Sequence, residues 1–434
     1  MIPLVVTILL DISVVKVYDL VTKSFISAQA KLVLFSINTS ICLALQLVLI
    51  KYLMSTLKKR GLNKKLRVTL WYRIALISLC VLGTLMGLLM FQQFYNNYYN
   101  TLIPIFIVII SYGTAVGFVI WLSTLFISWH KSYHNPIVFL YFVSMLLIAF
   151  NLLVTATITT FKINDRPDEI REFVGGSMVL SVGKYVFLEN TYQVSSIASF
   201  VSIWVTTAFL LSYYRDKLII NAIVYWIILS LPFVYFLASH LYWHIISDVL
   251  SSYLTADPVT VSIILTTFLS LSKPIVGLTF AVAFWKISSV INYEKNIKAY
   301  MIISGWGILL IFAADQGLVQ TQLQSPYPPF GLATITVLII AAYLMLLGIY
   351  NSATLVSANN ELRRSIYKHA SESKLLGAIG HAEMEKEIQN AVKQVNRDKY
   401  ELDKELEEPV ELDEIELEKY IEFVVKEVRK TGQH

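Results

Sequence analysis

Long apolar segments alternate with short polar connections along most of this chain. About twenty apolar residues in a helix cross the roughly 30 Å hydrocarbon core of a bilayer. Residues 2–24 begin apolar but contain Asp11, Lys16 and Asp19, so both a spanning and a surface position stay open for them. The clear segments are 32–53, 68–91, 102–128, 137–161, 194–214, 218–242, 259–285, 299–319 and 330–350. This pattern predicts an all-α polytopic transmembrane helical bundle of 9–10 spans.

The chain is organised around residues 325–366, where a Pro-rich turn leads into the last apolar segment. No Gly or Pro occurs between Gly348 and Gly377, so one continuous helix is expected to join the bundle, residues 1–350, to a helical tail, residues 351–434. Up to Pro409 the tail repeats apolar residues every three or four positions, as amphipathic and coiled-coil helices do.

After Pro409, residues 410–428 predict a second short amphipathic helix. Its apolar face needs a partner, which is the first tail helix, a second copy of the chain in a homodimer, or another protein.

Composition agrees with a membrane protein whose main partner is the lipid bilayer. The chain is 56 % hydrophobic and only 15 % charged, and its mean hydropathy is positive. A net charge of +5 gives no support for nucleic-acid binding. Cys42 and Cys80 both lie in apolar segments, where buried inert thiols are expected, and they provide neither a disulfide framework nor a metal site.

Lys and Arg gather in alternate connections. Residues 58–67 form the strongest basic block, and Lys131, Arg215, Lys217, Lys286, Lys295 and Lys298 follow in connections on the same side. Residues 92–101, 243–258 and 320–329 hold no Lys or Arg. The positive-inside rule therefore predicts a cell-membrane protein with the basic side and the C-terminal tail in the cytoplasm. Residues 162–193 are then extracellular, and the alternating stretch 175–193 predicts a small hairpin.

A weak internal repeat is present. Residues 117–135 resemble residues 277–295 at an offset of 160 positions, and the flanking segments keep step. A four-span parallel repeat, about 31–161 and 194–319, explains this likeness, and so does the similar composition of apolar segments.

Lys273 is the most informative single residue. It lies about midway along an apolar segment and directly precedes Pro274. A charge at this depth needs a partner or an interior position, and Asp315 in the next segment is the natural partner. Asn151 occupies a similar place in the first half of the repeat. These four residues are candidates for a ligand or transport site, and the alternative is an ion pair that only fixes helix packing.

His240, His244 and Asp248 recur every fourth residue at the end of one segment, so they share a helix face that could hold a metal. Polar residues facing lipid headgroups explain them equally well, because one helix supplies few ligands. His130 and His134 form a second pair with the same spacing, and we interpret them as solvated interface residues. No P-loop, H-E-x-x-H or G-x-S-x-G motif occurs, so neither an enzyme nor a cofactor is expected.

Three stretches of the chain carry a resemblance: PYPPFGLAT at 326–334, GIYNSATLVSANNELRRSI at 348–366 and KLLGAIGHAEMEKEIQ at 374–389. Together they resemble uncharacterised polytopic membrane proteins of ammonia-oxidising archaea. This resemblance implies an archaeal cell-membrane protein and transfers no activity or site residue.

Two functions follow as hypotheses. The first is a sensor or scaffold that passes a signal from the bundle along the continuous helix to the cytoplasmic tail. The second is a secondary transporter or channel for a small solute, with a polar site around Lys273 and Asp315.

Overall fold

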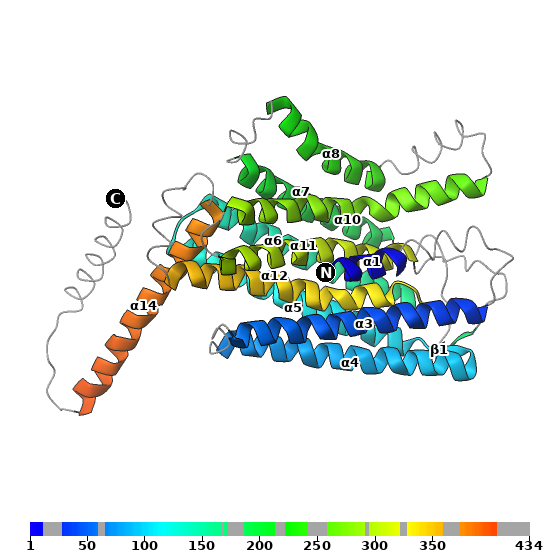
Figure 1. Cartoon of the computed structure of the whole chain (residues 1–434), viewed down its shortest axis with the longest axis horizontal. Coiled ribbons are helices and arrows are strands. Elements are labelled where there is room, and N and C mark those ends of the chain that lie inside the picture. The colour runs from blue at the N-terminus through cyan, green and yellow to red at the C-terminus, as the bar shows by residue number, and fades with distance from the viewer. Residues whose placement is uncertain are drawn as a thin grey trace.

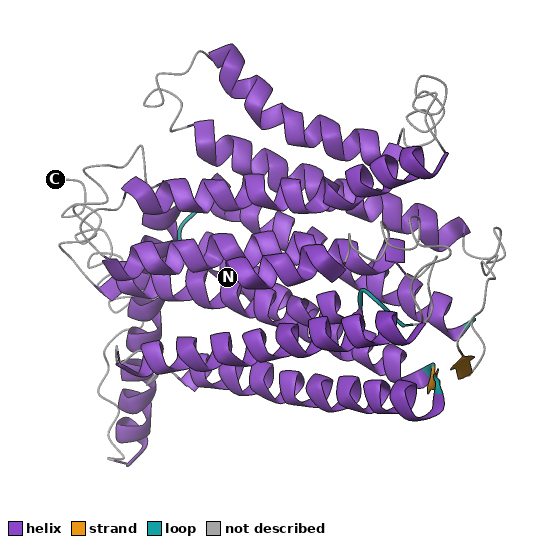
Figure 2. Cartoon of the chain, turned by 45° about the vertical axis from the view of Figure 1, so that its right-hand side comes forward, coloured by secondary structure: helices purple, strands orange, loops and turns teal. Residues whose placement is uncertain are grey.

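A computed structural model describes residues 1–11, 28–59, 66–165, 169–171, 186–212, 222–241, 258–290, 295–321, 328–358 and 374–405. These residues form a bundle of helices with very little other structure (Figures 1 and 2), which confirms the predicted all-α class. The helices are α1 (Ile2–Leu9), α3 (Ala28–Lys59), α4 (Leu66–Asn96), α5 (Leu102–Ser132), α6 (Pro136–Asn164), α7 (Val186–Ser212), α8 (Ala222–Leu241), α10 (Pro258–Val290), α11 (Lys295–Thr321), α12 (Leu332–Ala358) and α14 (Lys374–Glu405).

Seven of the described helices, α3, α4, α5, α6, α7, α11 and α12, are long and apolar enough to cross a membrane. Beside them lie α10, which has 33 residues, and α8, whose apolar part is the shorter stretch Ile223–Ala238. Helix α1 has only eight residues, about 12 Å of helix, and is too short to span alone. The rest of the predicted segment 2–24 lies outside the described residues.

The two short strands mark one end of the bundle. Strand β1 (Tyr98–Asn100) follows α4 and pairs antiparallel with β2 (Glu169–Arg171), which follows α6. We call this the strand end, and the opposite end, where α14 lies, the tail end (Figure 1). The predicted hairpin at 175–193 is wrong for residues 186–193, because they form the first turns of α7. The remainder of that stretch lies outside the described residues.

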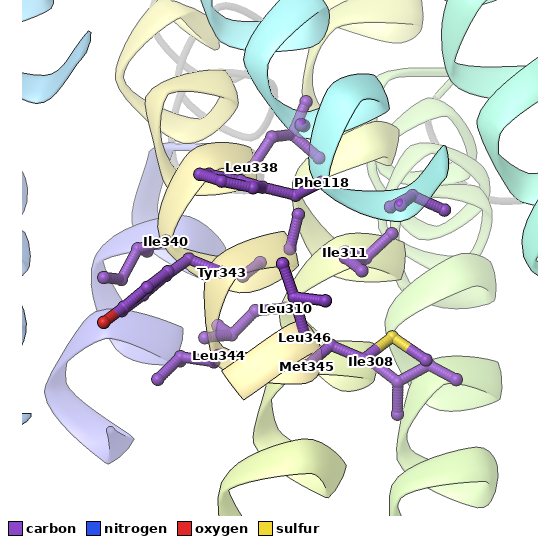
Figure 3. Close-up of a cluster of buried hydrophobic side chains, with 14 of the residues drawn as sticks. Phe118, Ile308, Leu310, Ile311, Leu338, Ile340, Tyr343, Leu344, Met345 and Leu346 are labelled. Atoms are coloured by element: carbon purple, nitrogen blue, oxygen red, sulfur yellow. The ribbon is translucent and has the colours of Figure 1, made fainter. Parts of the chain in front are cut away.

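Helix α12 is the centre of the bundle. All residues from Leu332 to Thr354 are buried, and α12 packs against α3, α4, α5, α11 and α14. Figure 3 shows Phe118 of α5 and the α11 side chains Ile308 and Ile311 around the α12 residues Leu338, Met345 and Leu346, whereas Tyr343 points away from α11. The last apolar segment, around which the sequence predicts the chain to be organised, is therefore also the helix at the centre of the packing.

Glycines bring α10, α11 and α12 close together. A Cβ at Gly277 of α10 would lie 2.8 Å from Phe312 Cβ of α11, and a Cβ at Gly307 of α11 would lie 2.6 Å from the backbone nitrogen of Met345 on α12. Gly348 of α12 in turn faces Ser304 of α11. Small residues allow this approach, which is how helices gain packing energy in lipid, where burial of apolar surface gives little.

The start of α12 is capped by a distant carboxylate. Asp11, just after α1, is 2 % exposed, and its Oδ2 accepts hydrogen bonds from the backbone N–H of Gly331 (3.1 Å) and Thr334 (3.1 Å) and from Thr334 Oγ1 (2.6 Å). Gly331 has φ 89°, a left-handed conformation that suits glycine. Asp11 thus accepts hydrogen bonds from the first backbone amides of α12, which have no acceptor within the helix.

The tail does not continue α12 as one straight helix. Gly380 of α14 sits directly against Val356 of α12, whereas 24 residues of continuous helix would separate these positions by about 36 Å. Helices α12 and α14 therefore do not form one straight helix, so the predicted continuous helix is wrong, and residues 359–373 lie outside the described residues. Leu375, Leu376, Ile379 and Ala382 on the first turns of α14 are buried against the bundle. The second tail helix predicted at 410–428 lies outside the described residues.

Candidate polar site within the bundle

Lys273 is buried inside the bundle, with 2 % of its surface exposed. Its ammonium group forms an ion pair with Asp315 Oδ2 of α11, which confirms the predicted partner. It also donates a hydrogen bond to the hydroxyl of Tyr192 on α7, at 3.0 Å. The positive charge of Lys273 is therefore neutralised by the Asp315 carboxylate and hydrogen-bonded to the Tyr192 hydroxyl.

Asp315 extends these contacts to α6. Its Oδ2 accepts a second hydrogen bond from Asn151 Nδ2, at 3.3 Å, so the structure brings Asn151 together with Lys273 and Asp315 as expected. Asn151 Oδ1 accepts from Ser195 Oγ of α7 at 3.1 Å. We call Lys273, Asp315, Tyr192, Asn151 and Ser195 the polar network. It links four helices: α6, α7, α10 and α11.

A fifth helix contributes Tyr112. This α5 side chain is fully buried and close enough to Asp315 to interact with it electrostatically. Its hydroxyl and Asp315 Oδ1 are both buried, and neither has a hydrogen-bond partner of good geometry among the described residues. Such atoms are rare in folded proteins, because each one loses its hydration without replacement. They mark this side of Asp315 as the part of the site that can accept or donate a further hydrogen bond.

The polar network lies in the half of the bundle toward the strand end. Asp315 is six residues before Thr321, the end of α11, which places it about 9 Å along the helix from that end. Lys273 is 15 residues after Pro258, the start of α10, near the middle of its helix. A long lysine side chain bridges this difference in depth, so the ion pair lies beneath the surface of the bundle.

Two backbone features of α10 support this placement. Pro274 has no N–H, so the carbonyl of Ser270 loses its usual partner one turn earlier. Gly277 lies one turn later and lets α10 approach α11 closely enough for Lys273 to meet Asp315. The role expected for Pro274 therefore rests on the freed carbonyl of Ser270.

The predicted metal residues are not brought together in the part of the structure that is described. His240 lies in the last turn of α8, but its side chain, His244 and Asp248 lie outside the described residues. Among the residues that are described, no group of three His, Cys, Asp or Glu side chains could hold a metal ion. His130 contacts the His134 ring, and its Nδ1 lies 3.2 Å from the carbonyl oxygen of Asn135 at the edge of the bundle. Of the cysteines, Cys42 is buried as expected, whereas Cys80 is exposed.

A second set of buried polar contacts joins α14 to the tail end. Trp129 Nε1 of α5 donates to Glu383 Oε2 at 2.6 Å, and the ring of His381 packs edge-on against Tyr133, with centroids 4.8 Å apart. His381 Nε2 also lies 3.4 Å from Glu385 Oε1 one turn later. Sequence reasoning missed this docking, and it also missed Tyr112, Tyr192 and Ser195, because tyrosine and serine occur in most of the apolar segments.

The apolar helices and their buried polar network define the class: a multi-pass integral membrane protein. Comparison of the chain with protein-family models, curated proteins and solved structures found no match. The function therefore has to be argued from the residues of the polar network themselves.

Proposed function

We propose that this protein is a secondary transporter that moves a small polar solute through the bundle past the polar network. The observation that carries the proposal is the ion pair of Lys273 and Asp315, buried among five helices and surrounded by hydroxyl and amide groups. Ionisable residues inside a membrane bundle are expensive, and transport pathways are a principal reason for them.

A packing role alone explains this site poorly. An apolar pair of similar size often stabilises a helix contact as well as a buried ion pair does, because both charges must first lose their hydration. Among the described residues, Asp315 Oδ1 and the Tyr112 hydroxyl lie side by side without a hydrogen-bond partner of good geometry, so this part of the network can take up a further hydrogen bond. A protein can keep buried polar atoms without partners, despite the lost hydration, where those atoms bind a solute or exchange partners during a transport cycle.

The proline in α10 supports movement at the same place. Pro274 follows Lys273 directly and weakens the helix one turn before the ion pair. Interrupted helices at mid-membrane depth are typical of transporter binding sites. We propose that α10 bends here as the Lys273 and Asp315 pair opens to admit a solute.

The orientation is part of the proposal. Lys58, Lys59 and Lys131 close helices at the tail end, where α14 also lies, so the positive-inside rule places α14 in the cytoplasm and the protein in the cell membrane. The polar network then lies in the outer half of the bundle.

Solute uptake into proteoliposomes tests the proposal. Purified protein would be reconstituted and given an equimolar mixture of amino acids, sugars, nucleosides and small organic acids under an inward pH gradient, with trapped solutes measured by mass spectrometry. We expect at least one solute to accumulate with wild-type protein and with Gly83→Ala, a variant at an open position on α4, but not with Asp315→Asn. Accumulation equal to that of protein-free liposomes for the whole mixture would contradict transport.

A sensor function is the second candidate, favoured by the docking of α14. Glu383 contacts α5 through Trp129, and the same helix carries Tyr112 beside Asp315. A change at the polar network could therefore reach α14 through one helix. Hydrogen–deuterium exchange of α14 should then differ between wild type and Asp315→Asn, whereas equal exchange would remove the support for sensing.

A further inference from the structure

We propose that the charge moved together with the solute is a proton held by Asp315, and that Lys273 acts as a built-in cation that keeps metal ions out. The inference rests on the proposed transport function and names the coupling ion at the same site. It follows from which atoms surround the ammonium group and which atom of Asp315 remains open.

The Lys273 ammonium occupies a position suited to a small cation. It is surrounded by oxygen atoms, the carboxylate Oδ2 of Asp315 and the hydroxyl of Tyr192, and Asn151 supports the same carboxylate oxygen. Hard cations such as Na⁺ are bound by oxygen ligands of this kind. Because the ammonium already neutralises the single carboxylate, a metal ion entering here would meet a second positive charge at close range without hydration.

A proton has a place that a metal ion lacks. Among the described residues, Asp315 Oδ1 is buried without a hydrogen-bond partner of good geometry, and the Tyr112 hydroxyl lies within reach of it. A proton arriving at Oδ1 converts the carboxylate to a neutral carboxylic acid, with no bond broken elsewhere and no change of oxidation state. The acid can then donate to the Tyr112 oxygen, while the freed Lys273 ammonium keeps its hydrogen bond to Tyr192 and can attract an anionic part of the solute.

The other titratable groups at the site are weaker candidates. Among the described residues facing the pair, α5 contributes Tyr112, α7 contributes Tyr192, and α6 contributes only the neutral amide of Asn151. A phenol binds its proton far more tightly than a carboxylic acid does at neutral pH. The carboxylate of Asp315 is therefore the group that exchanges the proton.

Thermal unfolding of detergent-purified protein tests the role of Lys273 without a known solute. The probes are NaCl and KCl, each compared with choline chloride at equal ionic strength. We expect no difference for wild type. We expect Lys273→Met to gain a Na⁺- or K⁺-dependent rise in apparent Tm of about 2 °C or more, because removing the ammonium leaves Asp315 as an open cation site. Adding Asp315→Asn should abolish that rise. Stabilisation of wild type by Na⁺ or K⁺, lost in Lys273→Met, would overturn the proposal.

Uptake into the proteoliposomes tests the proton and remains informative even if Lys273→Met cannot be purified. We expect uptake by wild type and by Gly83→Ala to be lost when the inward pH gradient is collapsed with a protonophore. Uptake that is unchanged without the gradient would show that no proton moves together with the solute. If the unfolding results hold but the liposomes take up no solute, transport is wrong and the built-in cation is retained.

Discussion

Replacing the two charges of the polar network separately and together is the most informative test of the structure. Lys273→Met removes the ammonium and leaves the Asp315 carboxylate, 3 % exposed, with only neutral donors, the Asn151 amide and the nearby Tyr112 hydroxyl. Asp315→Asn leaves the ammonium with only neutral acceptors, the Tyr192 hydroxyl and the new amide oxygen. Each single variant therefore contains a buried charge without a counter-charge.

The expected magnitude follows from that arrangement. Removing one partner of a buried ion pair costs about 3–5 kcal/mol of unfolding free energy. The double variant has no charge left in the polar network, so its loss should be smaller than the sum of the two single losses by about 2–3 kcal/mol. For a chain of this length each single variant should lower the apparent Tm by roughly 3–5 °C, and the double variant should recover much of that loss.

Thermal unfolding in one detergent, at neutral pH and fixed ionic strength, measures all four proteins. Lys286→Met is the matched control, because Lys286 lies on the same helix near its tail end, is partly exposed, and should change the unfolding free energy by less than about 0.5 kcal/mol. If the losses of Lys273→Met and Asp315→Asn simply add, the two side chains are not energetic partners, and the reasoning about the polar network fails.

Three further predictions concern contacts outside the ion pair. Asp11→Ala should lower the unfolding free energy by about 1–3 kcal/mol, because the first amides of α12 lose their acceptor, and Asp11→Asn should lower it less. If neither variant changes the unfolding free energy, the cap does not stabilise the protein. Gly277→Ala should lower the unfolding free energy by about 1–3 kcal/mol, since the added Cβ would overlap α11, whereas Gly83→Ala at an open position should be neutral. Equal unfolding free energies for the two variants would argue against the close approach of α10 and α11. Glu383→Ala should leave the Trp129 indole N–H without its acceptor and speed protease cleavage within α14, and unchanged cleavage would mean that this hydrogen bond does not hold the helix.

The helices could be predicted from the sequence because the bilayer fixes their length. The apolar segments at 102–128 and 137–161 became α5 and α6, extended by a few residues at their ends. The position of each helix in the bundle, central or facing lipid, could not be predicted from hydropathy. Helices α4 and α12 have the same mean hydropathy, yet 28 % of the apolar window of α4 is buried in the bundle, against 100 % for α12. Lipid and protein interior are both apolar, so hydropathy alone cannot distinguish them.

Pairing of polar residues could be predicted only where few partners existed. Lys273 and Asp315 lie in consecutive segments with few other charges, and consecutive helices usually pack together. The cap formed by Asp11 joins positions more than 300 residues apart, and no local pattern connects them. Tyr192 was equally hidden, because the chain contains 25 tyrosines and nothing in the sequence separates one that solvates a lysine from one that faces lipid.

The tail shows how one sequence feature can be interpreted in the wrong direction. Gly377 and Gly380 interrupt the apolar spacing and weaken a coiled-coil pattern. In the structure Gly380 is the point where α14 touches Val356 of α12, since any larger residue would collide there. The glycine therefore indicates close packing on another helix, and the absence of Gly and Pro before it did not predict one straight helix from α12 to α14.

The order of helix contacts bears on whether the ion pair is needed for packing. Helix α5 packs on α6 as α10 packs on α11, α4 contacts α5 as α8 contacts α10, and α3 contacts α4 as α7 contacts α8. This is the order that the predicted repeat requires, although the repeat itself stays a prediction. At its offset of 160 residues, Lys273 corresponds to Gly113, which has open space around it, and Asp315 corresponds to Thr155. Under the predicted repeat, α5 and α6 therefore pack together with neither a lysine nor an aspartate at these two positions. Lys273 and Asp315 both lie in the second half and contact the first half through Asn151, so packing of α10 on α11 does not by itself account for the ion pair, in line with the proposed role in moving a solute.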